Sequence, residues 1–267
     1  MNISKQELEK FKEKIRQKEQ LIYLTVSDPY SNEKLKFTIK NNSTYWRAKT
    51  LFTKEPGTIE WIRGFEKESV FYDIGANVGV YSLYAAKISN AKVYSFEPES
   101  NNFQALMENI LINNLNDFIL PFPIGLSNKN ELTNLNLSEF VVASSHHTVG
   151  KYGLDHNSLK KITNKHKQGI FSTTLDELHF GWKLPFPDHI KIDVDGIENK
   201  IIKGGSKTLK NPQLKSILIE INSNRKEDKK IIDKLKYYRF LYDEKQINDA
   251  MRLEGPHAGY AEYIFYR

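Results

Sequence analysis

Short apolar runs alternate with helical periodicities along the central part of the chain. The run at 70–72 (V-F-Y) is rich in residues that favour strands, so it predicts a buried strand that ends at Asp73. The same reasoning predicts, in order, helix 80–89, strand 92–97, helix 99–113 and a strand within 118–125. Repeated pairs of strand and helix favour an α/β fold with a parallel sheet and helices on both faces.

The pattern continues toward the C-terminus. It predicts strand 189–194, helix 197–209, strand 216–221, helix 231–238 and late strands at 240–242 and 261–266. Between the two halves, residues 132–137 have the alternation of an edge strand or hairpin, and residues 173–178 the start of a short helix. Residues 138–172 are polar and irregular, and we interpret them as a substrate loop or lid.

Residues 1–66 are predicted to form an accessory segment ahead of a main domain at 67–267. A capping box, Ser4-x-x-Glu7, opens a helix whose apolar face would cover the domain or contact a second copy. After this helix the pattern predicts strands 21–26 and 34–39 and helices 45–52 and 58–65.

Two glycines follow the strand at 70–73 with the spacing D-x-G-x-x-x-G, formed by Asp73, Gly75 and Gly79. A strand, a glycine turn and a helix bring a nucleotide-like ligand close to bare backbone, although an ordinary strand-to-helix turn would show the same spacing. The motif differs from the G-x-G-x-x-G of dinucleotide sites, and its acid would repel a pyrophosphate. A cationic ligand fits better, and S-adenosylmethionine carries a sulfonium and an ammonium. Glu97, at the end of the next strand, is placed to accept hydrogen bonds from both ribose hydroxyls.

Composition and charge narrow the class of protein. The chain of 267 residues has no cysteine, which excludes disulfides, thiolate metal sites and a cysteine nucleophile. It shows no apolar run long enough for a membrane span and no signal-peptide core, so a cytoplasmic protein is expected. The net charge of +6 lies partly in two lysine-rich helical stretches mixed with acids, which we interpret as solvated helix faces rather than a nucleic-acid surface. A positive field also suits an acidic small substrate, such as a sugar phosphate or a nucleotide sugar.

Four short motifs occur in a fixed order along the chain. They read V-F-Y-D-I-G-A-N-V-G, V-Y-S-F-E-P-E, I-K-I-D-V-D-G-I-E and I-L-I-E-I-N. In this order they resemble the FkbM-type methyltransferases, and the resemblance covers residues 53–222. It implies a Rossmann-like class I methyltransferase that uses S-adenosylmethionine, with a seven-stranded, mostly parallel sheet whose last strand is antiparallel. It also implies O-methylation of a sugar, glycan or polyketide-type hydroxyl, in surface-polysaccharide or natural-product biosynthesis.

The resemblance assigns a cofactor site to this chain, residue by residue. The cofactor-binding residues would be Asp73, Gly75, Ala76, Asn77, Gly79, Glu97, Pro98, Gly125, Ser127 and Asp193. Those of the glycine turn would lie along methionine and ribose, and Gly125 with Ser127 would lie near the adenine. Asp193 would end its strand facing the same cleft; alternatively, it caps the helix that follows. Its proximity to Asp195, where the family more often has Glu, and to Glu198 favours the cleft.

Methyl transfer to a sugar hydroxyl requires that the acceptor oxygen be aligned and its proton removed. His146 and His147 lie in the predicted lid, and together with Asp193 they are the candidate catalytic residues; alternatively, both histidines are surface residues of a polar loop. Magnesium held by Asp193, Glu220 and Asn222 is a second route, since all three offer oxygen ligands. Structural ion pairs would explain the same acids.

Candidate acceptor contacts lie in the accessory segment, the lid and one late strand. They are Tyr45, Arg47, Glu55, Ser145 and Glu220. Arg47 is suited to hold a substrate phosphate through two N–H groups, although an exposed arginine on a surface helix is the alternative.

The sequence leaves other functions open. They are methylation of a small phosphorylated metabolite, methylation of nucleic acid, and a non-catalytic role as a cofactor-binding interaction protein. The aromatic motif of amino-directed base methylation is missing at 192–195, which disfavours nucleic acid. The sequence also leaves open that the chain forms a homodimer.

Overall fold

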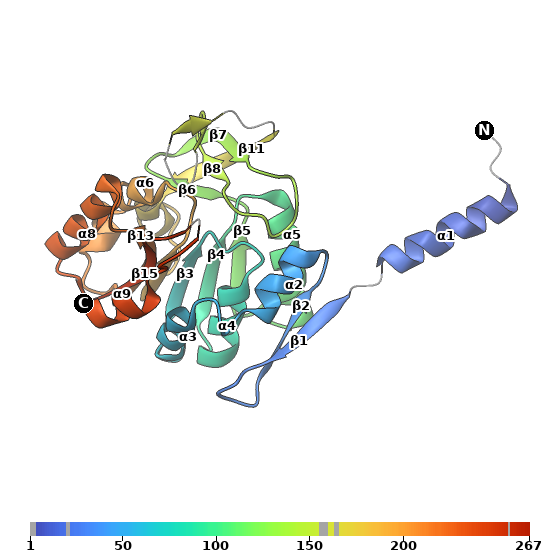
Figure 1. The fold of residues 1–267 in the computed structure, drawn as a ribbon, viewed down its shortest axis with the longest axis horizontal. Coiled ribbons are helices and arrows are strands. Elements are labelled where there is room, and N and C mark those ends of the chain that lie inside the picture. Colours follow the sequence, from blue (N-terminus) through green and yellow to red (C-terminus); the bar gives the residue numbers. More distant parts are fainter. Residues whose placement is uncertain (1–3, 20–21, 155–159, 163–165, 256) are drawn as a thin grey trace.

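The computed structural model of the protein describes residues 4–19, 22–154, 160–162, 166–255 and 257–267 (Figure 1). Its centre is a seven-stranded sheet in the order β14-β15-β13-β12-β3-β4-β5. The strands are β3 (Val70–Ile74), β4 (Lys92–Phe96), β5 (Ile119–Phe122), β12 (His189–Ile192), β13 (Ser216–Asn222), β14 (Leu241–Tyr242) and β15 (Tyr260–Tyr266). Strand β15 is antiparallel to β13 and to β14, and the pairs from β13 to β5 are parallel. The predicted α/β fold with an antiparallel last strand is therefore confirmed.

Two hydrophobic clusters cover the two faces of this sheet, because neighbouring residues of a strand point to opposite sides. Phe71 and Leu218 pack with α3 (Pro56–Arg63), α4 (Val80–Ser89) and α5 (Ser100–Ile112). Tyr72 and Ile219 pack on the other face with α6 (Glu198–Lys203), α7 (Ser206–Lys210), α8 (Lys226–Tyr237) and α9 (Glu244–Ala250). The predicted helix 197–209 is thus two helices that separate at Gly204 and Gly205, and α9 was not predicted. A Cβ at Gly204 would lie 2.5 Å from the carbonyl oxygen of Ser127, so the break permits close packing.

A second, four-stranded sheet lies beside the first, in the order β6-β11-β7-β8. Its strands are β6 (Gly125–Ser127), β7 (Glu131–Leu137), β8 (Thr148–Val149) and β11 (His166–Thr174). The interpretation of 138–172 as irregular was therefore wrong for β8 and for most of β11, as well as for the short hairpin of β9 (Gly153–Leu154) and β10 (Lys161–Ile162). The nine residues of β11 are mostly polar, and the strand forms because it pairs with β6 on one side and β7 on the other. Strand β11 also replaces the start of the predicted helix at 173–178, and a π-helix, η1 (Glu177–Gly181), follows it.

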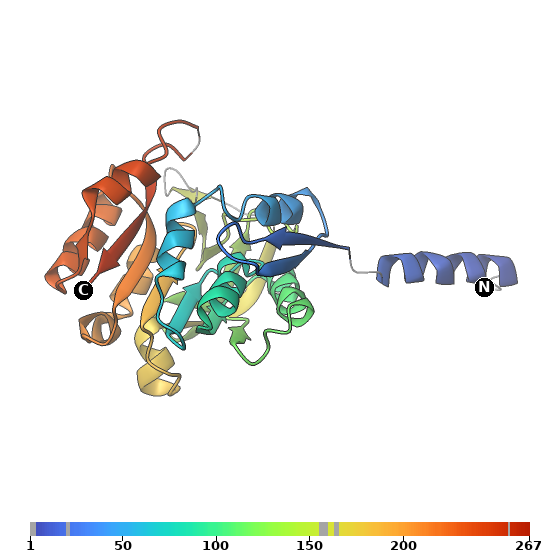
Figure 2. The same cartoon turned by 90° about the horizontal axis from the view of Figure 1, so that it is seen from below.

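The N-terminal segment contributes a hairpin, β1 (Tyr23–Ser27) with β2 (Lys34–Thr38), and the helix α2 (Asn42–Lys49). The side-chain oxygens of Asn109 on α5 and of Asn113, which directly follows this helix, accept hydrogen bonds from the backbone of β2, so the hairpin is fixed to the main domain. Helix α1 (Lys5–Glu19) begins with the predicted capping box but extends away from the α/β body (Figures 1 and 2). It therefore does not cap the domain, and its role as a contact with a second copy stays a prediction.

Candidate active site

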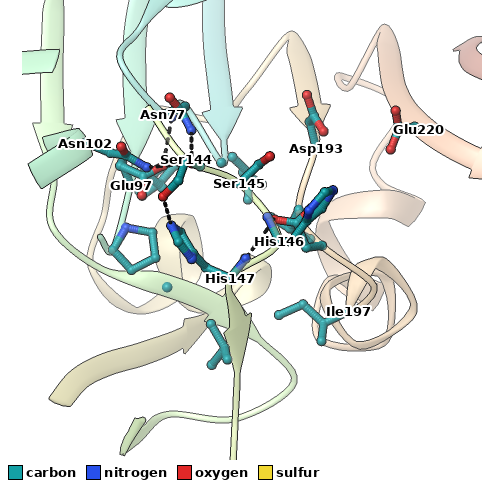
Figure 3. Close-up of a pocket in the computed structure, with 18 of the residues that line it drawn as sticks. Asn77, Glu97, Asn102, Ser144, Ser145, His146, His147, Asp193, Ile197 and Glu220 are labelled. Atoms are coloured by element: carbon teal, nitrogen blue, oxygen red, sulfur yellow. Dashed lines mark hydrogen bonds between the residues drawn. The ribbon is translucent and has the colours of Figure 1, made fainter. Parts of the chain in front are cut away.

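A cleft of about 370 Å³ opens where the parallel strands end. Ligands of open α/β sheets bind at this edge, beyond the carboxyl ends of the strands. Glu97, Asn77 and Asn102 lie on one side of the cleft, and Asp193 and Glu220 lie on the other (Figure 3). The segment that carries His146 crosses between them (Figure 3). The cleft thus has two chemically different ends, joined beneath one loop.

The glycine turn after β3 has the geometry that its spacing predicts. Gly75 has φ +82°, and a Cβ there would lie 2.0 Å from the carbonyl oxygen of Asp193. Gly79 has φ +83°, and its Cβ would lie 2.3 Å from the side chain of Leu106. Only glycine allows both the left-handed backbone and this close approach of β12 and α5. The glycines therefore shape the cleft floor by packing, and bare backbone faces the cavity at Gly75.

We expect Gly75→Ala to lower the free energy of unfolding by about 2–4 kcal/mol, because it adds backbone strain to overpacking. Gly169→Ala is a matched control, since a Cβ at Gly169 would have no neighbour within 4 Å. Urea unfolding of the two variants measures the difference. Equal midpoints for both would show that the turn after β3 tolerates a side chain.

Glu97 organises the first end of the cleft. Its carboxylate is 5% exposed and accepts hydrogen bonds from the backbone N–H of Asn77 (2.8 Å) and of Glu99 (2.9 Å). Burial raises the pKa of Glu97 to about 7, although both hydrogen bonds oppose that shift. The carboxylate therefore connects the glycine turn to the end of β4, and it lines the cavity beside the apolar side chains of Ile124, Leu126 and Val149.

A loop over 142–147 is fixed across the middle of the cleft by polar side chains from other elements. Asn77 and Asn102 both donate through Nδ2 to the carbonyl oxygen of Ser144, at 2.9 and 3.3 Å. Arg47 donates through Nε to the carbonyl oxygen of Ala143 at 3.1 Å. The loop is thus held from α2, from the glycine turn and from α5.

Asp195 holds the same loop from the opposite side. One carboxylate oxygen accepts hydrogen bonds from the backbone N–H of His146 (2.6 Å) and of His147 (3.1 Å). Burial and the neighbouring charges of Asp193 and Glu220 raise the pKa of Asp195 to about 7. Asp195 therefore sets the position of both candidate histidines.

The two histidines have different environments. The His147 ring lies 3.0 Å from the Ser144 hydroxyl through Nε2, and its Nδ1 accepts from the backbone N–H of Ser138 at 3.2 Å. Burial lowers the pKa of His147. His146 is exposed in the cleft, on the side of Asp193 and Glu220 (Figure 3). His147 therefore holds the loop, while the side chain of His146 is exposed in the cleft beside the ring of His257.

Asp193 forms an ion pair with a buried lysine at the other end of the cleft. The ammonium of Lys191, which is 1% exposed, lies 2.6 Å from an oxygen of Asp193. Lys191 is also paired in register with Asp73 on the neighbouring strand. Burial disfavours the charged carboxylate of Asp193, but Lys191 and Lys54 outweigh it and hold its pKa well below the usual value. Asp193 therefore presents a negative charge to the cleft.

A second group of charges surrounds Arg252, on the segment before β15. Arg252 donates to Glu220 at 2.6 Å, pairs closely with Glu262, and lies 3.7 Å from Glu55. Glu55 is buried, pairs with Lys54 and accepts a hydrogen bond from the Tyr81 hydroxyl at 2.7 Å. These contacts form a polar wall at the acidic end.

The structure brings most of the predicted site residues to this cleft. Those that line it are Arg47, Gly75, Asn77, Glu97, Pro98, Gly125, Ser145, His146, His147, Asp193 and Glu220. Ala76 lines a small cavity of about 30 Å³ that the cleft adjoins through Gly75 and Asp193. The remaining predicted residues are not among the lining residues of the cleft: Tyr45, Glu55, Asp73, Gly79, Ser127 and Asn222. Asp73 lies below it, 1% exposed, and accepts a hydrogen bond from Ser82.

Several residues of the cleft and of the small cavity beside it were missed from the sequence. They are Trp46, Asn102, Lys191, Arg252 and His257. Lys191 had a signal, because a lysine inside the apolar run I-K-I is unusual for a strand buried on both faces. The other four residues reach the cleft only through the tertiary fold, which no local sequence pattern indicates.

The magnesium alternative finds no support in the part of the chain that the structure describes. No group of three histidine, aspartate or glutamate side chains there could hold a metal ion. Asp193 and Glu220 each pair with a cationic side chain, and the Asn222 amide is directed to the carbonyl oxygen of Ala258. We therefore assign no metal-dependent step. None of the helices within the described ranges is both long and apolar enough to cross a membrane.

The match to a known family covers most of the residues that line the cleft. The model of the "Methyltransferase FkbM domain" matches residues 73–242, which is more than half of the chain. The chain belongs to the FkbM methyltransferase family. The predicted activity of an S-adenosylmethionine-dependent methyltransferase is confirmed with it.

Relatives of this FkbM methyltransferase include proteins that are named as methyltransferases. A "Hexuronic acid methyltransferase AglP" from Haloferax volcanii is 22% identical over 201 residues, covering 75% of this chain and 77% of the relative. A "tRNA (guanine(37)-N(1))-methyltransferase" from Dictyostelium discoideum is 28% identical over 105 residues, covering 39% of this chain and 20% of the relative. The solved FkbM methyltransferase of Methylobacillus flagellatus is 14% identical with a TM-score of 0.49, covering 86% of this chain and 56% of that one.

Proposed function

We propose that this FkbM methyltransferase transfers a methyl group from S-adenosylmethionine to a hydroxyl of a sugar or glycan precursor. The observation that carries the proposal is a single cleft with Glu97 at one end and the ionised Asp193, beside the exposed His146, at the other. A hydroxyl-binding end and an anionic end match the ribose and the cationic centre of the cofactor. The sugar acceptor is supported by the relative that methylates a hexuronic acid.

The chemistry of the residues present fits the cofactor. Glu97 offers carboxylate lone pairs that would hold the ribose hydroxyls, and Ile124, Leu126 and Val149 offer an apolar surface for the adenine. Asp193 offers a negative charge near the backbone of Gly75, where the sulfonium and ammonium would be stabilised. When bound, S-adenosylmethionine supplies an electrophilic methyl group on its sulfonium.

His146 is the residue that we assign to proton removal. Its backbone is fixed by Asp195, and its ring is exposed toward the acidic end of the cleft. A neutral imidazole within reach of the acceptor hydroxyl would take its proton as the oxygen becomes nucleophilic. Asp193 and Glu220 would orient the acceptor by accepting hydrogen bonds from its other hydroxyls.

We expect His146→Ala to lower kcat by about 10²–10⁴-fold with little change in the affinity for S-adenosylhomocysteine. His147→Ala is expected to raise the KM for the acceptor, because it removes the ring that holds Ser144 and Ser138. Initial rates and calorimetric titrations of both variants separate the two roles. A normal kcat for His146→Ala would assign the proton to another residue.

The proposed reaction is tested with [methyl-¹³C]S-adenosylmethionine and paired methyl glycosides of glucuronic acid and glucose. The proposal predicts a new ¹³C O-methyl resonance on a sugar, and its loss in His146→Ala. The match to a tRNA methyltransferase makes nucleic acid the second candidate acceptor, and the net charge of +6 suits a polyanion. Label found on tRNA and on no sugar would contradict the proposal.

A setting in surface-polysaccharide or natural-product synthesis belongs to the same proposal. This setting is supported only by the proposed sugar acceptor and by the family resemblance. The alternative of a non-catalytic binding protein would gain support if the cofactor bound and no labelled product formed with sugars, phosphorylated metabolites or nucleic acid.

A further inference from the structure

A second cavity of about 530 Å³ adjoins the cleft and has no role in the reaction described above. We name it the side cavity, and its lining residues are Asn42, Ser43, Trp46, Arg47, Ser138, Glu139, Ala143, Ser144, Ser145 and His146. Five of them also line the cleft: Trp46, Arg47, Ser144, Ser145 and His146. The two cavities therefore adjoin along the segment that carries His146.

Trp46 gives the side cavity a flat apolar surface among polar groups. The Trp46 side chain is 48% exposed on α2, beside the hydroxyl and amide groups of Asn42, Ser43 and Ser138. Several large apolar side chains are exposed on this protein, and Trp46 differs from the others in lining both the cleft and the side cavity. A pyranose ring has an apolar C–H face and polar hydroxyl edges, so it matches an indole surrounded by hydrogen-bonding side chains.

The side cavity is lined by one guanidinium, from Arg47, and by one carboxylate, from Glu139. Arg47 uses Nε to bind Ala143, and its two terminal nitrogens have no hydrogen-bond partner among the described residues. Two parallel N–H groups of an arginine fit a carboxylate or a phosphate. Asn42 and Ser43 line the cavity from the first turn of α2, where the helix dipole also attracts negative charge.

We propose that the side cavity binds a second, anionic sugar unit of the acceptor, next to the unit that is methylated beside His146. This inference rests on the proposed function, because it places the reacting sugar in the cleft. Trp46 stacks on the apolar face of the second unit, and Arg47 binds its carboxylate or phosphate group. Ser43 and Glu139 are available for its hydroxyls, and the Ser138 hydroxyl, which donates to the carbonyl oxygen of Ser145 at 2.6 Å, can accept from one of them. The enzyme would then select an acidic oligosaccharide over a neutral one.

Tryptophan fluorescence measures this binding without any turnover. The chain has 3 tryptophans, of which Trp61 is 5% exposed and Trp182 is 40% exposed. Trp182 lines neither cavity, so Trp182→Phe removes an exposed indole outside them and leaves Trp46 as the exposed indole. With S-adenosylhomocysteine bound, the titrants are cellobiose, cellobiouronic acid and cellobiose 6′-phosphate. The inference predicts a saturable change for an acidic disaccharide, with an affinity about 10-fold or more above that for cellobiose.

Variants test whether the disaccharide binds in the side cavity, and Ser43 lines this cavity but not the cleft. By calorimetry, Trp46→Ala is expected to weaken the acidic disaccharide about 10-fold, whereas Trp182→Phe leaves its affinity unchanged. Ser43→Glu adds a negative charge to the cavity while the hydrogen bond from Arg47 to Ala143 stays available, so it should remove the preference for acid. Comparing the carboxylate with the phosphate identifies which anion is preferred.

The outcomes separate this inference from the proposed function. Equal affinities for acidic and neutral disaccharides, or binding unchanged by both Trp46→Ala and Ser43→Glu, would overturn the side-cavity inference even if sugars are methylated. Absence of methyl transfer to every sugar would overturn the proposed function instead, and the titrations would still decide what the side cavity binds.

Discussion

Lys191→Met is expected to lower the free energy of unfolding by about 3 kcal/mol, because it leaves Asp73 and Asp193 without their shared cation. Asp73 is 1% exposed and one of its oxygens has no hydrogen-bond partner, so its charge depends on Lys191. The side chain of Asp193 is 35% exposed in the cleft, where water can solvate its charge. The expected loss of stability is therefore at the lower end of the range for breaking a buried ion pair. Urea unfolding measures the change.

The double variant Lys191→Met/Asp193→Asn is the control for this prediction. Removing the charge of Asp193 should restore part of the lost stability, and the double-mutant cycle gives the coupling between the two side chains. Lys191→Met should also raise the pKa of Asp193, since the cation that lowers it is gone. An unfolding midpoint equal to that of the wild type would show that the buried ion pair is not needed to hold the end of β12.

Glu97→Ala is expected to weaken the binding of S-adenosylhomocysteine by about 100-fold or more. Its carboxylate would hold the ribose hydroxyls, and hydrogen bonds to a charged group contribute about 1.5–3 kcal/mol each. The same substitution releases the N–H groups of Asn77 and Glu99, which loosens the glycine turn. Calorimetric titration measures the loss, and near-normal affinity would place the ribose elsewhere.

The pKa of Glu97 also predicts that the affinity for S-adenosylhomocysteine depends on pH. Because burial raises this pKa to about 7, the carboxyl is mostly protonated at pH 6 and mostly ionised at pH 8. Only the ionised form offers all of its lone pairs to hydroxyl donors, so the affinity for S-adenosylhomocysteine should rise as the pH increases through 7. Glu97→Gln carries no titrating group and should weaken this rise. A rise equally large in Glu97→Gln would assign it to another group.

The central sheet could be predicted because its parallel strands are short apolar runs buried on both faces. The glycine turn was predictable as well, since the positive φ of Gly75 and Gly79 requires a residue without a side chain. Strand β11 could not be predicted, because its polar residues form a strand only through pairing with β6 and β7. Local pattern thus revealed most of the elements that bury apolar side chains and missed β11, which depends on non-local pairing.

The cleft residues that directly follow apolar strands could be predicted, whereas those that reach the cleft through tertiary contacts could not. Glu97 and Asp193 end apolar strands, so their position follows from the strands themselves. Arg252 and His257 reach the cleft because β15 runs antiparallel to β13, which places the segment before β15 at the end of β13. The loop over 142–147 is positioned by residues that are distant in the sequence. Asn102 lies 41 positions from its partner in this loop, and Asn41 lies 101 positions from its own. Such contacts exist only in the folded chain.

A crystal structure of the protein with S-adenosylhomocysteine tests the account most directly. We predict that the ribose hydroxyls lie within hydrogen-bond distance of Glu97, with the adenine against Ile124 and Leu126 and the sulfur between Gly75 and Asp193. His146 should face the space beside the sulfur. A cofactor product bound outside this cleft, or bound in it with its ribose away from Glu97, would contradict the assignment of the active site.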